Sequence, residues 1–334
     1  MSAAKTIYVG MHDGVCAVTT EDGGSSWQQG PVTSLPHAAA RLVASPVNPK
    51  RAYLVAYEAG VYRTDDGGMS WSHLDSYPSD YAHSVLAHPT EGDTLYVGSE
   101  PATVYRSEDG GQTWSELKGF TQVPESVDWS FHSPTRDSHV RDLRVAPDDP
   151  NRIYPGLNDD IHCVALSDDR PGSVYVATAQ APYRSNDGGA NWELINDGLD
   201  RRYTLHISPA PDDASLVLVT VSENARRLNP LFYRSTDSGD NWQLVDDVGQ
   251  GTEPEDMVVA FEWDPSEPNR VYAGADGGKL YQSADRGRYL GRTVGPSPIR
   301  GGGGIGRRPQ LAERAKRVWR VSSRLCGPFG QRIE

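Results

Sequence analysis

The chain has 334 residues, a formal net charge of −13 and a mean hydropathy of −0.58. No apolar run approaches the roughly 20 residues of a membrane-spanning helix, and the N-terminus leads into a predicted strand without a signal peptide. The cysteines, Cys16, Cys163 and Cys326, lack the paired spacing of a disulfide framework or a zinc site. We therefore expect a cytoplasmic protein, monomeric and without a cofactor.

Charge is divided unevenly along the chain. Residues 1–285 hold twenty Lys or Arg against forty-three Asp or Glu, a net charge of −23, whereas residues 286–334 hold twelve against two, a net charge of +10. A folded region this acidic repels nucleic acids and anionic membranes, so neither is an expected partner of residues 1–285. Scarce lysine and abundant aspartate indicate an acidic, halophilic surface.

Short strands follow one another along the chain in a repeated order. Each unit reads as a strand, a Pro/Asp turn, two further strands, an Asp/Gly turn and a last strand. The second strands are centred, in chain order, on Tyr8, Tyr53, Tyr96, Tyr154, Tyr175, Leu218 and Tyr272. Four antiparallel strands per unit is the composition of a β-propeller blade.

The Asp/Gly turn has the pattern Ser/Thr-x-Asp-x-Gly-x-x-Trp. Its Asp and Trp residues are Asp22 and Trp27, Asp66 and Trp71, Asp109 and Trp114, Asp187 and Trp192, and Asp237 and Trp242. A sixth copy begins at Ser283 and loses its Trp. The hydroxyl and the carboxylate can accept hydrogen bonds from turn N–H groups, and the glycines supply positive φ. These aspartates are therefore expected to be structural rather than catalytic or metal-binding.

The units predict an all-β propeller of six to seven four-stranded blades over residues 1–287. Tyr154 and Tyr175 are only 21 residues apart, with no turn motif between them. We interpret this as a blade that has lost about half its length and left an unpaired strand edge; the alternative is a six-blade ring with an insertion.

The repeat pattern stops at Arg286, and residues 288–334 form a basic, Gly/Arg-rich tail that predicts disorder. Two interpretations of this tail are open: a segment that binds nucleic acid or acidic partners, and a frame-shifted terminus. Because the chain opens on the second strand of a unit, the first blade lacks its innermost strand. We see no strand in the tail to supply it, which predicts weak closure between the first and last blades.

Alignment of the units places comparable residues at the entry of the innermost strands: Arg41, His83, Arg141, His162, Tyr203 and Val259. A mouth of this composition suits carboxylates or sugar hydroxyls. The alternative is that these are ordinary strand-end residues facing solvent. No metal site is expected, because the histidines lie on different units and no His-x-x-x-His motif is present.

Residues 125–141 interrupt the repeat, and loops on a rigid scaffold often carry function. In this segment Trp129 is a candidate to stack on a ligand, and His132, Arg136 and His139 are candidates to orient its polar groups. The alternative is a surface loop that covers a blade edge.

The turn motif and the units resemble those of the BNR or Asp-box repeat propellers, over residues 5–287. That group includes sialidases, xyloglucan-active glycoside hydrolases, the sortilin ectodomain and photosystem assembly factors. The resemblance implies the fold and leaves the activity open.

The enzymatic members of the group are matched only in part. A sialidase reading would use Arg41 and Arg141 as carboxylate-binding arginines and Tyr203 as the nucleophile, but the Arg-Ile-Pro signature, a third arginine and a partner Glu are missing. A xyloglucanase reading would use Asp128 and Asp137.

The sequence thus favours a non-catalytic propeller that binds a carbohydrate or a protein. A glycoside hydrolase is the first alternative, and an assembly-factor scaffold is the second.

The acidic composition makes a prediction about salt. Screening of like charges by KCl, raised from about 0.1 M to about 3 M, should increase the melting temperature because it relieves repulsion within the −23 region. Thermal unfolding followed by circular dichroism measures this; a melting temperature indifferent to salt would contradict the halophilic interpretation.

Overall fold

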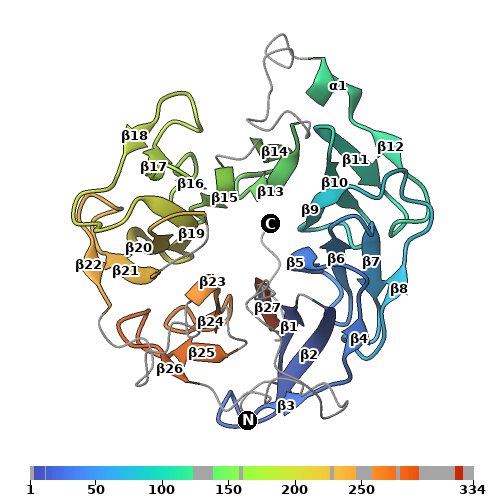
Figure 1. Ribbon diagram of the computed structural model, residues 1–334, viewed down its shortest axis with the longest axis horizontal. Helices are drawn as coiled ribbons and strands as arrows, with labels where there is room; N and C mark the ends of the chain where they lie inside the picture. Colours follow the sequence, from blue (N-terminus) through green and yellow to red (C-terminus); the bar gives the residue numbers. More distant parts are fainter. Residues whose placement is uncertain are drawn as a thin grey trace, which may run out of the picture.

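The computed structural model describes residues 4–11, 13–122, 138–157, 161–225, 229–245, 258–275, 279–292 and 320–325. Within this part of the chain, small antiparallel sheets stand radially around a central axis, as Figure 1 shows. The protein is therefore an all-β propeller, as the sequence predicts. No helix among the described residues is long and apolar enough to cross a membrane.

The strands follow one another around the ring in chain order. Their bounds are β1 (Lys5–Gly10), β2 (Gly14–Thr20), β3 (Gln28–Gln29), β4 (Thr33–Ser34), β5 (Ala39–Ala44), β6 (Ala52–Ala56), β7 (Val61–Thr64), β8 (Ser72–His73), β9 (Ala82–Ala87), β10 (Leu95–Ser99), β11 (Thr103–Ser107), β12 (Ser115–Glu116), β13 (Val140–Ala146), β14 (Asp149–Leu157), β15 (Ile161–Leu166), β16 (Val174–Thr178), β17 (Pro182–Ser185), β18 (Glu193–Leu194), β19 (Tyr203–Ala210), β20 (Asp213–Ser222), β21 (Leu231–Ser235), β22 (Gln243–Leu244), β23 (Val258–Trp263), β24 (Val271–Ala275), β25 (Leu280–Ser283), β26 (Gly291–Arg292) and β27 (Arg320–Leu325). A single helical turn, α1 (Lys118–Thr121), follows β12.

Six sheets have the four strands of a complete blade. The first is β27-β1-β2-β3, with β4 also paired to β2, and the others are β5–β8, β9–β12, β15–β18, β19–β22 and β23–β26. Between the third and the fifth positions of the ring stands a sheet of two strands only, β13 and β14. This reduced blade confirms the prediction that one blade is truncated.

Strand β14 of the reduced blade is more exposed than the corresponding strands of complete blades. Along β14 most residues are exposed or half-buried, whereas β6, β10, β16 and β24, the second strands of complete blades, are buried throughout. Among the described residues β14 pairs only with β13. The predicted unpaired strand edge is therefore present.

Each turn motif is a compact network of hydrogen bonds. In the first copy the Thr20 hydroxyl donates to Asp22 Oδ1 at 2.7 Å and accepts from the N–H of Gly24 at 3.0 Å. Ser26 donates its N–H to Asp22 Oδ1 at 2.9 Å and its hydroxyl to Oδ2 at 2.6 Å. Gly24 has φ +96°, which a residue with a Cβ rarely adopts. The other four complete copies repeat these contacts.

The sixth turn is complete as well, which corrects the expectation that the repeat pattern stops at Arg286. The Ser283 hydroxyl donates to Asp285 Oδ1 at 2.7 Å, and the N–H of Tyr289 donates to the same oxygen at 3.0 Å. Leu290 stands where the other copies have Trp and is fully buried. The substitution keeps a buried apolar side chain at this position, and β26 still forms and completes the last blade.

Tryptophans of the turns pack on the preceding blade. Trp71 meets Tyr8 edge to face at 6.0 Å between ring centroids, and Trp27 meets Tyr272 at 5.7 Å. Such aromatic pairs add about 0.5–1.5 kcal/mol beyond the area they bury. Trp242 donates its N–H to the carbonyl of Ile195, just after the outer strand of the preceding blade, at 2.8 Å. Trp192 follows the reduced blade, which has no such segment, and is 44% exposed.

The ring is closed by β27, which is the innermost strand of the first blade and pairs antiparallel with all six residues of β1. The expectation that the tail lacks a closing strand is therefore wrong. Strand β27 was missed because its Arg-rich surroundings hide a six-residue run, and because its partner lies at the other end of the chain. Residues 288–292 of the tail, for which disorder was predicted, instead belong to the last blade. Residues 293–319 and 326–334, the remainder of the tail, lie outside the described residues.

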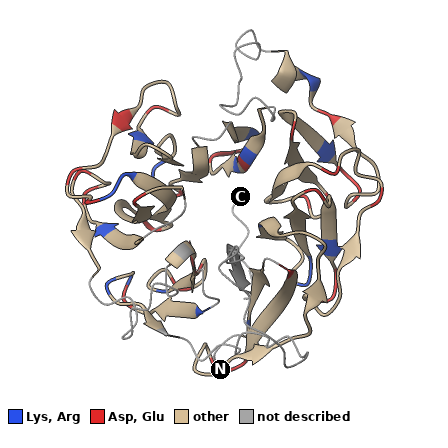
Figure 2. Ribbon diagram, in the orientation of Figure 1, with Lys and Arg blue, Asp and Glu red and all other residues tan. Residues whose placement is uncertain are grey.

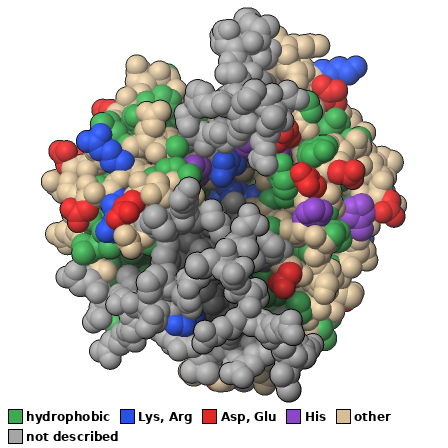
Figure 3. Space-filling model, viewed as in Figure 1, with side chains coloured by type: hydrophobic (Ala, Val, Ile, Leu, Met, Phe, Trp, Pro, Cys, Tyr) green, Lys and Arg blue, Asp and Glu red, His purple; other side chains and the backbone are tan. Residues whose placement is uncertain are grey.

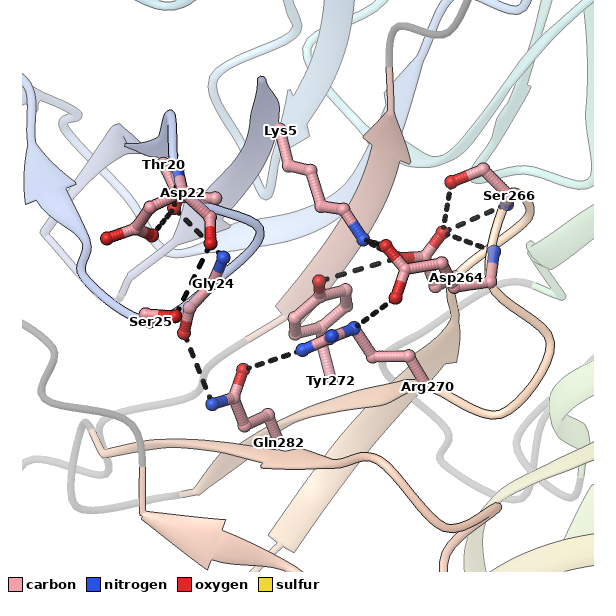
Figure 4. A network of polar contacts seen from close by, with 11 residues as sticks. Lys5, Thr20, Asp22, Gly24, Ser25, Asp264, Ser266, Arg270, Tyr272 and Gln282 are labelled. Atoms are coloured by element: carbon pink, nitrogen blue, oxygen red, sulfur yellow. Dashed lines mark hydrogen bonds and ion pairs between the residues drawn. The ribbon is translucent and has the colours of Figure 1, made fainter. Parts of the chain in front are cut away.

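Side chains strengthen the same closure, contrary to the expected weak contact between first and last blades. Lys5, 2% exposed, donates from Nζ to Asp264 Oδ2 at 2.7 Å and also contacts Glu267 (Figure 4). Asp264 accepts from the Tyr272 hydroxyl at 3.4 Å, and Gln282 donates to the carbonyl of Gly24 at 3.3 Å. The first and last blades are thus joined by a buried ion pair.

Removal of the lysine should weaken the ring. Lys5→Met leaves the buried Asp264 carboxylate without its cation, and breaking such a pair costs about 3–5 kcal/mol. Urea unfolding measures the loss; Lys50→Met, at an exposed position, is the control and should change stability little. Equal stabilities of the two variants would show that the ion pair does not hold the ring.

Acid should loosen the turns. Hydrogen bonds from the side chain and N–H of Asn191 and from Ser185 lower the pKa of Asp187 to about 2. Because the folded pKa lies below the unfolded value, this stabilisation is present above about pH 4 and is lost as pH falls toward 2. Thermal unfolding between these pH values should show the loss.

The matched variants for that experiment are Asp187→Asn and Asp80→Asn. The first should be less stable at neutral pH and less sensitive to acid. Asp80 is exposed and its carboxylate has no hydrogen bond to a described residue, so its variant should follow the wild-type curve. Identical acid sensitivity of Asp187→Asn and the wild type would contradict the assignment.

Candidate functional site

The innermost strands share a distortion at one height of the ring. In six of them the register skips one residue near the strand start, which defines a β-bulge. The skipped residues are Ala40, His83, Arg141, His162, Leu205 and Val259. A bulge bends its strand and redirects the side chain, and bulges are common beside functional sites. The axial rim, as we call this ring of six bulges, is therefore the first place to look for chemistry.

The sequence alignment placed four of its six mouth residues on the axial rim itself: His83, Arg141, His162 and Val259. Arg41 lies one residue after a bulge, and Tyr203 lies two residues before one. The Pro/Asp turns located the rim because the strand between turn and bulge has nearly constant length.

Arg41, His162 and Tyr203 come together across the central channel. Arg41 donates from Nη2 to the carbonyl oxygen of His162 at 2.5 Å. The His162 ring lies 4.7 Å from the Tyr203 ring, and its Nδ1 is 2.5 Å from the carbonyl oxygen of Thr204. These contacts link blades two, five and six.

His83 and His139 form a second group, and the structure adds Glu100 to it. The two imidazole rings stack at 4.3 Å between centroids with an angle of 21°. His83 Nε2 is 2.9 Å from Glu100 Oε2, and His139 Nδ1 is 3.9 Å from the same oxygen. These three residues could hold a metal ion, since their ligand atoms all lie within 4.8 Å of one another. Sequence reasoning missed Glu100, which follows β10 in an ordinary turn.

The remaining sequence-predicted candidates are five residues of the inserted segment and Arg141. Asp128, Trp129, His132, Arg136 and Asp137 lie outside the described residues. Arg141 stands at the bulge of β13 and is half-buried.

A cavity of about 680 Å³ lies deeper along the innermost strands. Its walls include the apolar residues Val43, Leu86 and Ala260. They also include six charged or titratable residues: Arg41, Asp142, Arg144, Asp168, His206 and Glu262. Figure 2 shows acidic and basic residues side by side on β13 next to the axis, and Figure 3 shows basic side chains near the centre of the ring. We call this the axial cavity. Apart from Arg41, its charged residues were not selected from the sequence.

Two arginines hold Asp142 in its ionised form. Asp142 is 2% exposed and lies 3.4 Å from Arg41 Nε and 3.5 Å from Arg144 Nη2; it also accepts from the N–H of Val164 at 2.9 Å. Burial alone would favour the protonated acid, but the two guanidinium groups and the amide outweigh it and keep the pKa of Asp142 below its usual value. In return Asp142 raises the pKa of Arg144.

The other titratable groups of the cavity, Asp168, His206 and Glu262, have pKa values that burial shifts toward the neutral form. Burial lowers the pKa of His206 to about 4, so its imidazole is uncharged at neutral pH. Burial also raises the pKa of Glu262, in spite of the nearby Arg144. The axial cavity therefore carries two fixed positive charges, one firm negative charge and two carboxyl groups, Asp168 and Glu262, whose pKa values burial raises. Such a set attracts an anionic group.

A signal for this cavity exists in the sequence. Arg41, Asp142, Arg144, His206 and Glu262 stand at alternate positions of strands whose neighbouring residues are apolar. Charged residues at positions that share one face of the innermost strands mark the channel wall.

Residues 17–154, less than half of the chain, match the family model described as Sortilin, neurotensin receptor 3. The same stretch contains three of the hydrogen-bonded Asp turns. The chain is an Asp-box β-propeller. No match was found among curated protein sequences.

Solved structures similar to this Asp-box propeller include glycoside hydrolases. The GH74 xyloglucanase from Xanthomonas campestris is 16% identical with a TM-score of 0.43, and the match covers 84% of this chain and 43% of that one. The GH74 enzyme from Niastella koreensis is 14% identical with a TM-score of 0.42, and covers 84% and 42%. This propeller therefore spans less than half the length of these enzymes.

A further similar structure is that of YCF48 bound to D1 peptide. It is 16% identical with a TM-score of 0.41, over 88% of this chain and 84% of that one. At these identities the similarities concern the fold.

Proposed function

We propose that this propeller is a non-catalytic binding protein whose axial cavity receives a negatively charged group, a carboxylate, of its ligand. The observation that carries the proposal is the pair Arg41 and Arg144, which both lie beside the buried carboxylate of Asp142 inside a cavity of about 680 Å³. A volume of this size is typical of sites for small ligands or for one end of a larger one.

The chemistry of the walls favours a carboxylate. Guanidinium groups bind carboxylates through paired N–H donors, and these interactions gain strength in surroundings that exclude water. The neutral His206 adds no repulsion toward an anion. The apolar residues Val43 and Leu86 give the remainder of the ligand a surface to cover. An acidic sugar and the carboxylate of a peptide both fit this description, so a carbohydrate and a protein partner are the two sources to distinguish.

The state of Asp142 argues against catalysis. A general base must release its partners to accept a proton, but Asp142 is held by two arginines and a backbone amide. Its depressed pKa makes it a weak base.

One observation favours the hydrolase as a second candidate. Asp142 and Glu262 line one cavity, and their pKa values are shifted in opposite directions. Pairs of carboxyl groups separated in this way serve as acid and base in glycosidases. In that case Glu262 would act as the general acid.

Ligand-observed proton NMR on the full chain in about 0.1 M KCl tests the proposal, because higher salt would screen the attraction between opposite charges. The panel contains sialyllactose, neutral xyloglucan oligosaccharides and short peptides with a free or an amidated C-terminus. We expect line broadening for carboxylate-bearing compounds only. Arg144→Met should weaken that binding about tenfold or more, since it removes a charge-assisted hydrogen bond.

Arg152→Met is the matched control, since Arg152 is exposed on the reduced blade and pairs with Asp148. Arg144→Lys keeps the charge and should retain part of the affinity if the cavity binds anions. New sugar signals that Glu262→Gln abolishes would assign a hydrolase instead. Absence of any binding by folded wild-type protein would overturn the proposal.

A further inference from the structure

We propose that His83, Glu100 and His139 bind a divalent zinc ion at the axial rim, between the third blade and the reduced blade. The site is separate from the axial cavity, whose lining includes none of the three residues. It also departs from the expectation of no metal, which was drawn from spacing along the chain alone.

The donor atoms match the ion. Two imidazole nitrogens and one carboxylate oxygen form a donor set that zinc uses in proteins, with the fourth tetrahedral position left for water. Around a tetrahedral zinc with bonds of about 2.0–2.1 Å, neighbouring ligand atoms lie about 3.4 Å apart. Glu100 Oε2 lies 2.9 Å from His83 Nε2 and 3.9 Å from His139 Nδ1, and no separation in the group exceeds 4.8 Å. Side-chain movements on the order of 1 Å would bring all three atoms onto one ion.

The fold presents these side chains together. His83 is the bulge residue of β9, so its side chain is redirected relative to a regular strand. Glu100 comes directly after β10, the strand beside β9, and His139 comes directly before β13. Stacking with His139 and an edge contact at 5.3 Å with Tyr57 fix the His83 ring. A preset ring orientation lowers the entropy that metal binding must offset.

Burial makes a cation favourable here. The side chains of His83, Glu100 and His139 are 10%, 11% and 3% exposed. A carboxylate this far from water attracts a cation strongly, because little water screens the interaction. Zinc supplies two charges at the point where the three donor atoms converge, whereas a protonated imidazole supplies one.

A zinc ion at this place would also support the weakest part of the ring. Glu100 and His83 belong to the third blade, and His139 leads into β13 of the reduced blade, for which the described residues show no outer strands. Coordination would therefore tie the reduced blade to a complete neighbour. Binding to the folded chain alone raises its apparent stability, so zinc should raise the melting temperature.

Titration of the full chain tests the site. Protein treated with a chelator and dialysed is titrated with Co²⁺, whose visible absorption reports tetrahedral coordination, and then with Zn²⁺ in competition. We expect one equivalent of Co²⁺ per chain, displaced by Zn²⁺, and a higher melting temperature with either ion. No visible Co²⁺ band and no shift of the melting temperature would overturn the proposal.

Variants locate the bound ion. His83→Ala, His139→Ala and Glu100→Gln should each weaken Zn²⁺ binding at least about tenfold, since loss of a second-sphere partner alone already costs that much. His73→Ala is the matched control, because His73 also sits beside a carboxylate, 2.6 Å from Asp75, but has no third ligand there. Unchanged affinity in the three site variants would overturn the assignment.

X-ray absorption spectroscopy of zinc-loaded wild-type protein covers the case in which a variant fails to fold. Two imidazole rings and light oxygen atoms in the first shell support the site. Sulfur in that shell would place the ion on a cysteine and overturn the proposal. Neither result depends on ligand binding in the axial cavity, so the two proposals can fail separately.

Discussion

Every blade of this ring buries the faces of its sheet only against the two adjacent blades. A sheet of four short strands has no core of its own, so the ring has to close before any blade is fully covered. Closure depends on β27, which pairs with the whole of β1, and on Lys5, whose ammonium group is buried against Asp264. These contacts join parts of the chain more than 250 residues apart. The remaining architecture is a series of local hairpins that this long-range contact holds together.

The same geometry creates both candidate sites. Bulges at one height of six innermost strands turn side chains toward one another across blades, which no single hairpin could achieve. Deeper in the channel, alternate residues of these strands face the axis and form the axial cavity. A ring therefore assembles a site from side chains contributed singly by several blades, each fixed by its own sheet.

Local features of this structure were predictable from sequence, and long-range ones were not. The Asp turns follow from residues within eight positions, so their hydrogen bonds and the truncated blade were foreseen. The last turn was missed because Leu290 replaces a Trp, although a buried apolar side chain is all that the position requires. Strand β27 was missed because the sequence of neither β1 nor β27 indicates that its pairing partner lies at the other end of the chain.

The candidate sites divide in the same way. Repeat alignment located His83, Arg141 and His162 at the axial rim, since that position is set by strand length. It did not find Glu100, which lies 17 residues from His83 in sequence and meets it only after folding. Asp142 and Arg144 were passed over because charged residues in a strand read as solvent-facing until the closed ring encloses them.

The reduced blade shows that the inner and outer strands of a blade have different structural roles. Its two inner strands, β13 and β14, keep their place in the ring, although the described residues give this blade no outer pair of strands. One consequence is that Trp192 on the next blade is left exposed. The ring itself stays closed. The inner strand pairs therefore maintain the ring, and an outer pair can be absent from a blade without opening it. In this ring, a blade reduced to its inner pair still contributes its share of the wall of the central channel.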